Sequence, residues 1–228
     1  MRYFPAGRAP AAATRWTGHC SCISIAAPDR DPDMLADCSL GQRNAALLRL
    51  RQSLFGDALA CCIDCPRCSE RLEFSLRASA LLAQHRDDAC QVELGGLRFR
   101  LPTTRDLARI AGESEENVGA QKLLWSLIGP DQASETGAME RLAERLARAL
   151  EDADPCLDFA LDFDCPECGN RWTASFDIAA HLWQEIDARS RRLLDEIHIL
   201  ARAYGWPERE ILALTDARRQ AYLERATA

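Results

Sequence analysis

Two short cysteine motifs, one hundred residues apart, constrain this chain more than any other feature. Residues 65–68 and 165–168 both have the form Cys-Pro-x-Cys. The likeness continues past the cysteines, since Arg71 and Ser75 recur as Arg171 and Ser175. Each proline breaks helical structure, and the residues that follow each motif alternate apolar and polar side chains. We therefore interpret each motif as a turn that precedes a β-strand.

The four motif cysteines form a complete ligand set for a metal ion. Zinc prefers four tetrahedral ligands, and one Cys-x-x-Cys turn supplies two of them. Four thiolates leave no open coordination position, which is typical of structural rather than catalytic zinc. We predict that Cys65, Cys68, Cys165 and Cys168 hold one structural zinc ion per chain. Four cysteines without metal, or a redox pair, are the alternatives, although a redox Cys-x-x-Cys is expected at the start of a helix.

Composition and charge narrow the class of protein. Eleven cysteines in a chain of 228 residues favour metal binding over a disulfide framework. No apolar run approaches the length of a membrane span, and Pro5 and Pro10 interrupt any signal-peptide core. A net charge of −7 disfavours a broad nucleic-acid surface. We expect a cytoplasmic protein without a membrane span.

Hydrophobic periodicity predicts an α+β fold. We expect small antiparallel strands around a four-cysteine zinc ribbon, a helical insertion at about residues 77–156 and a helical segment at the end of the chain. The expected domains are a flexible arm at 1–33, the zinc-ribbon domain at 34–176 and a helical docking segment at 177–228. Within these, we expect helices at 41–55, 116–128, 137–152 and from 178 to Gly205, strands at 71–76, 92–94, 97–101 and 157–163, and a hairpin at Gly95-Gly96.

Other candidate site residues carry weaker signals. His198 lies beside the apolar stripe of the long helix, where a packing role is expected. His85 and His181 lie near predicted helix ends and suggest solvated or capping roles. Cys20 and Cys22 lie beside His19, but the segment offers no fourth ligand, so both are expected to be free surface thiols. No metalloprotease, phosphate-loop, dinucleotide or nucleophile-elbow motif occurs, so we predict no enzyme activity and name no catalytic residue.

A series of motifs marks the C-terminal quarter of the chain. They are Cys165-Pro166-Glu167-Cys168-Gly169, Trp172, Phe176-Asp177-Ile178, Leu182-Trp183, Glu196-Ile197-His198, Tyr204-Gly205-Trp206, Glu210-Ile211-Leu212-Ala213-Leu214 and Arg218-Arg219-Gln220-Ala221-Tyr222-Leu223. With these motifs the chain resembles a known family, the zinc-containing baseplate proteins of contractile tails. These are similar to the base plate proteins of T-even-type phages and occur in phage tails and phage-tail-like contractile injection systems. The resemblance is best over residues 165–225 and extends to 40–76.

The resemblance implies a non-enzymatic role in building a tail or baseplate. The partners it implies are baseplate, tube, sheath or spike proteins, and the chain would be incorporated in the particle or act during its assembly. A zinc-ribbon nucleic-acid-binding protein is the main alternative. Arg67, Arg71 and Arg171 favour it, whereas Glu70 and Asp164 dilute the positive charge. A thiol oxidoreductase would instead be metal-free with a reactive thiol.

Overall fold

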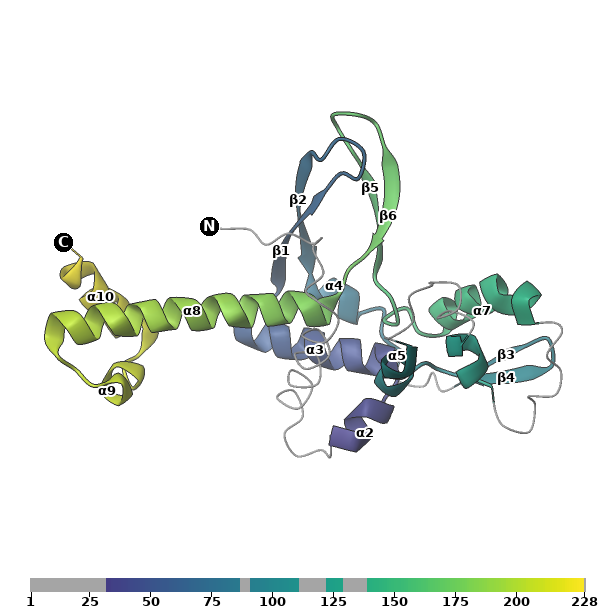
Figure 1. Cartoon of the computed structure of the whole chain (residues 1–228), viewed down its shortest axis with the longest axis horizontal. Helices are drawn as coiled ribbons and strands as arrows, with labels where there is room; N and C mark the ends of the chain where they lie inside the picture. Colours follow the sequence, from purple (N-terminus) through teal and green to yellow (C-terminus); the bar gives the residue numbers. More distant parts are fainter. Residues whose placement is uncertain (1–31, 87–90, 111–121, 129–138, 228) are drawn as a thin grey trace. The chain divides into compact units, whose positions relative to one another are not determined.

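A computed structural model describes residues 32–86, 91–110, 122–128 and 139–227 of the chain (Figure 1). These residues form two units, one up to Leu182 and one from Trp183 onward, and each is described by itself. The arm expected at residues 1–33 lies outside the described residues, except for its last two. The predicted domain boundaries after residues 33 and 176 stay a prediction.

The first unit is built on helix α3 (Leu40–Phe55). Ser39 begins it with a capping box: the Ser39 hydroxyl accepts from the Gln42 backbone N–H (3.1 Å), and the Gln42 side chain accepts from the Ser39 N–H (3.2 Å). Gly56 ends it with φ of 84°, a conformation that favours glycine. Leu47 and Leu48 are fully buried, so the helix expected at residues 41–55 is confirmed together with its inward apolar face.

Two antiparallel hairpins carry the cysteine motifs. β1 (Ala58–Asp64) pairs with β2 (Arg71–Arg77), and β5 (Ala160–Asp164) pairs with β6 (Arg171–Ser175). Each motif is the turn of its hairpin, and the two turns lie at the same end of the paired ribbons in Figure 1. The Phe74 and Phe163 rings meet edge to face at 5.1 Å between centroids, which packs one hairpin on the other.

The insertion between the hairpins contains a small core of its own. β3 (Gln91–Leu94) and β4 (Leu97–Arg100) pair through a turn at Gly95-Gly96, where both glycines have positive φ, as expected for a tight hairpin. Helix α5 (Thr104–Ile110) and helix α7 (Met139–Ala153) follow. The core consists of Val92, Leu97, Phe99, Leu101, Leu127, Leu146 and Leu150. Of the helix expected at 116–128, residues 122–126 are helical, and residues up to 121 lie outside the described part of the chain.

A buried ion pair organises the start of α5. The Asp106 side chain is 1% exposed and accepts two short hydrogen bonds from the Arg100 guanidinium, at 2.6 and 2.7 Å. It also accepts from the Thr103 backbone N–H at 2.9 Å and from the Thr103 hydroxyl at 2.8 Å. Although burial opposes ionisation, these bonds lower the pKa of Asp106 to about 2. The carboxylate therefore links β4 to α5 as a charged group.

The second unit consists of the rest of helix α8 (Ile178–Tyr204), α9 (Glu208–Leu212) and α10 (Asp216–Ala226). Gly205, with φ of 69°, ends α8 where the sequence predicts. Leu200, Ile211 and Leu223 form the core of this unit. The Tyr204 ring stacks on the Trp206 ring at 4.7 Å between centroids. Arg219, which is almost buried, donates to Glu196 at 2.8 Å and to Asp216 at 2.6 Å.

The predicted fold class is confirmed: the chain is α+β, with small antiparallel hairpins, a four-cysteine cluster between two of them, and a long C-terminal helix. Three elements are not predicted by the sequence: β1, α2 (Pro32–Asp37) and α4 (Ala78–Leu82). The strand expected at 157–163 begins at Ala160. None of the described helices has the length and apolar character needed to cross a membrane.

Candidate metal centre

The two cysteine turns have the same backbone structure. In the first, the Ser69 N–H donates to the Cys65 carbonyl (2.9 Å) and the Cys65 N–H donates to the Glu70 carbonyl (2.8 Å). In the second, the Gly169 N–H donates to the Cys165 carbonyl and the Cys165 N–H to the Asn170 carbonyl, both at 2.9 Å. The internal repeat seen in the sequence is therefore a structural repeat of two matching knuckles.

The residue that closes each turn has a left-handed backbone. Gly169 has φ of 66°, and Ser69 adopts nearly the same value, 61°. Among the described residues, Ser69 is the only non-glycine with positive φ. A residue with a Cβ pays a conformational penalty in this region. The first turn is therefore locally strained at Ser69, and its backbone has the same form as the second turn at Gly169.

The four motif cysteines come together between the hairpins. The Cys65 and Cys168 sulfurs are 3.7 Å apart, and the Cys68 and Cys165 sulfurs are 3.5 Å apart. All four Sγ atoms lie within 4.8 Å of one another. A tetrahedron with zinc–sulfur bonds of about 2.3 Å has edges of about 3.8 Å. The cluster therefore has the donor type, number and spacing to hold one metal ion such as zinc.

Hydrogen bonding at the cluster favours a mixture of thiol and thiolate. Burial raises the pKa of Cys65, but backbone N–H donors of Cys68 and Arg67 and neighbouring thiols outweigh it and lower that pKa to about 6. At Cys68 the Glu70 N–H lowers the pKa, yet desolvation and hydrogen bonds with the other three thiols dominate and raise it to about 12. Ionisation of one thiol thus makes ionisation of its neighbours less favourable, and a bound cation would offset the repulsion between the negative charges.

The hairpins surround the cluster with paired charges. Asp64 and Arg71 lie 4.0 Å apart beside the first turn, and Asp164 and Arg171 lie 2.9 Å apart at the matching position of the second. Arg71 also donates to the Cys62 sulfur at 3.2 Å. The arginines that follow the knuckles therefore have acidic partners within the same hairpin.

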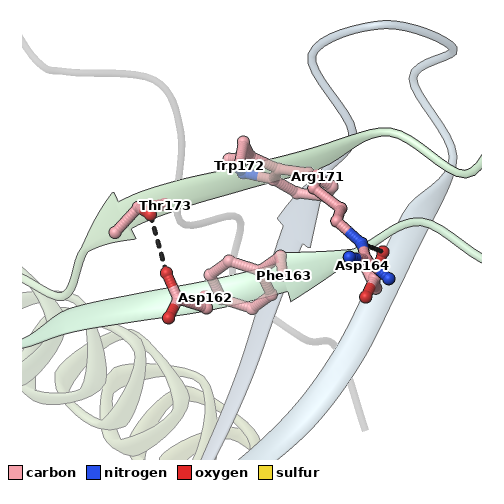
Figure 2. Close-up of a pocket in the computed structure, with 6 residues that line it drawn as sticks. All are labelled: Asp162, Phe163, Asp164, Arg171, Trp172 and Thr173. Atoms are coloured by element: carbon pink, nitrogen blue, oxygen red, sulfur yellow. Dashed lines mark hydrogen bonds and ion pairs between the residues drawn. The ribbon is translucent and has the colours of Figure 1, made fainter.

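An open recess of about 530 Å³ lies on the β5–β6 hairpin (Figure 2). Its apolar surface comes from Phe163 and Trp172, whose rings stack at 5.3 Å between centroids. Its polar side chains bond to each other, since the Thr173 hydroxyl donates to Asp162 at 2.7 Å and Arg171 pairs with Asp164.

The weaker candidates fall in different places. His198 is exposed on α8, so the packing role expected for it is wrong. The His181 and Phe176 ring centroids are 5.3 Å apart. The His85 side chain lies close to those of Asp154 and Cys156, two residues that the sequence did not indicate as candidates. Cys20 and Cys22 lie outside the described residues.

Comparisons with protein-family models, with curated proteins and with solved structures found no match to this chain.

Proposed function

We propose that Cys65, Cys68, Cys165 and Cys168 hold one structural zinc ion per chain. The meeting of four sulfur atoms from two matched turns, at near-tetrahedral spacing, carries this proposal. Four thiolates complete the coordination sphere, so the ion would serve the fold rather than a reaction. It would join the two hairpins at their turns, at the point where the chain returns from its long insertion.

We further propose that the chain is a non-enzymatic structural or assembly component of a contractile-tail baseplate, in a phage tail or a phage-tail-like injection system. The resemblance of residues 165–225 to zinc-containing baseplate proteins supports this. So does the combination of a metal-stabilised hairpin pair with a separate helical unit, which offers two surfaces for other proteins. Baseplate, tube, sheath and spike proteins are the proposed partners.

Several large apolar side chains of the helical unit are exposed to solvent. Trp183 is 43% exposed and Leu194 is 62% exposed. They are eleven residues apart on α8, which at about 100° per residue places them on nearly the same side of the helix. Leu212 on α9 is also exposed. We propose these exposed apolar side chains as contact points for a partner protein.

Copurification tests this proposal. The tagged full chain should retain sheath, tube, spike or other baseplate proteins from cells that produce contractile particles. Leu194→Asp should reduce that retention at least tenfold. Ala203→Asp is the matched control: it adds the same charge at an exposed position nine residues away, on the opposite side of α8, and should retain the partners.

The same preparation tests the nucleic-acid alternative. A nucleic-acid binder would copurify with material absorbing at 260 nm and would release it as salt rises, because counterion release governs such binding. The pairing of Arg71 with Asp64 and of Arg171 with Asp164 argues against a free basic face on the knuckle strands. Salt-dependent retention of nucleic acid without tail proteins would replace the baseplate proposal with this one.

A further inference from the structure

A second cluster of metal-ligating side chains lies away from the four cysteines. His85, Asp154 and Cys156 each present one ligand atom, and these three atoms lie within 4.8 Å of one another. His85 follows α4, and its backbone N–H donates to the Leu82 carbonyl at 3.0 Å. Asp154 directly follows α7, and Cys156 lies in the short segment that leads to β5. Two segments distant in sequence thus converge on one point.

Two of these three side chains are fully enclosed by protein. Asp154 is 1% exposed and Cys156 is 0% exposed, while His85 is half-buried. Among the described residues, no arginine or lysine forms an ion pair with Asp154. Its carboxylate accepts from the Cys156 backbone N–H at 3.2 Å and from the Ser39 hydroxyl at 3.5 Å. A buried carboxylate is costly unless charge or strong hydrogen bonds compensate it.

The surrounding structure holds the donor groups in place. Asn44 on α3 donates its side-chain amide to the Cys156 carbonyl at 2.9 Å and to the Leu157 carbonyl at 3.3 Å. The Cys156 sulfur lies 3.7 Å from the Leu81 carbonyl oxygen at the end of α4. Gly41 lets the Asp154 carboxylate approach the first turn of α3, because a Cβ at that position would overlap the carboxylate. The donors thus lie on a packed scaffold.

The donor chemistry indicates which ion would fit. An imidazole, a carboxylate and a thiolate together are a mixed nitrogen, oxygen and sulfur set, which suits zinc and similar borderline cations rather than calcium or magnesium. Tetrahedral sites of this kind have ligand atoms roughly 3.3–3.8 Å apart. The three donor atoms, within 4.8 Å of one another, are therefore at most about 1–1.5 Å farther apart than in such a site.

We propose that His85, Asp154 and Cys156 bind a second divalent ion of the zinc type at the base of the insertion. The four-cysteine cluster joins the turns of the two hairpins, whereas this triad joins the segment that leaves β2 and α4 to the segment that enters β5. The ends of the insertion would then be linked at two places. This inference does not depend on the contractile-tail proposal.

Metal counting on the full chain tests the second site. Protein purified without chelator and equilibrated with zinc should contain two zinc ions per chain. Cys156→Ser should lower this to one, and Cys165→Ser should also lower it to one by removing the other ion. Cys38→Ser is the matched control, since Cys38 belongs to neither cluster, and it should keep two.

Cobalt substitution shows which site each variant retains. Cys156→Ser should keep the intense sulfur-to-cobalt charge-transfer bands of a four-thiolate site, and Cys165→Ser should keep a weaker spectrum with one thiolate. Should Cys156→Ser fail to fold, His85→Gln at its half-buried position decides the question with the same expected loss of one ion. A wild-type content of one ion that neither Cys156→Ser nor His85→Gln reduces would overturn the proposal, and Asp154 would then serve only the start of α3.

Discussion

Removing one zinc ligand should cost a large part of the stability of the first unit. Cys65, Cys68, Cys165 and Cys168 close a long loop, because Cys68 and Cys165 are 97 positions apart in sequence. Cross-linking a loop of about 100 residues removes entropy from the unfolded chain worth about 4.7 kcal/mol. The Phe74–Phe163 contact remains when the ion is gone, and unfolded cysteines retain some affinity for zinc. We therefore expect Cys165→Ser to lower the free energy of unfolding by about 3–5 kcal/mol.

Urea denaturation followed by circular dichroism measures this loss. Chelator should destabilise the wild-type protein at least to the level of Cys165→Ser, and it should destabilise the variant less, because the variant has already lost the ion of the four-cysteine cluster. Cys38→Ser should unfold like the wild type. A loss below about 1 kcal/mol in Cys165→Ser, together with an unchanged response to chelator, would refute the loop-closure reasoning.

Four further substitutions have effects that follow from the structure. Gly169→Ala should destabilise the protein by about 1–2 kcal/mol, because its backbone φ of 66° is unfavourable for a residue with a Cβ, even though no atom lies within 4 Å of the added Cβ. Ser69→Gly should be neutral or stabilising, and thermal unfolding of both variants checks these two expectations. Asp106→Asn should lower stability by about 2 kcal/mol at pH 7, measured in urea, by weakening the bonds from Arg100 and Thr103. Because the folded-state pKa of Asp106 is depressed to about 2, its contribution is present above pH 4 and should fade as pH falls toward 2, and Asp106→Asn should lose this part of the pH dependence. Ser39→Ala should cost about 1 kcal/mol in the same assay through loss of the α3 cap.

The features that sequence reasoning predicted are those with strong local signals. The Gly95-Gly96 pair predicted a hairpin because both positions need positive φ, and Gly205 predicted the end of α8 for the same reason. The four-cysteine cluster was predictable because its spacing repeats and zinc imposes a ligand number. In each case the residue type itself, glycine at positive φ or paired cysteines, is compatible with few local structures.

The features that were missed depend on tertiary contacts. β1 contains small residues, and its adjacent Cys61 and Cys62 are both buried, so the strand lacks clean alternation and is defined by its pairing with β2. His85 and Asp154 are separated by the whole insertion and share no motif. Only the return of the chain beside its starting point brings them together, and no local pattern in the sequence encodes that meeting.

Site-resolved alkylation of cysteines, with and without chelator, tests the four-thiolate zinc site most directly. Cys68 is exposed, so solvent reaches it in the folded protein. We predict that Cys65, Cys68, Cys165 and Cys168 resist iodoacetamide in the zinc-loaded protein and become reactive together as chelator removes the ion that they bind, whereas the reactivity of Cys38 does not change. If Cys68 reacted at the same rate before and after chelation, and no zinc left the protein, the four-cysteine metal site would be contradicted.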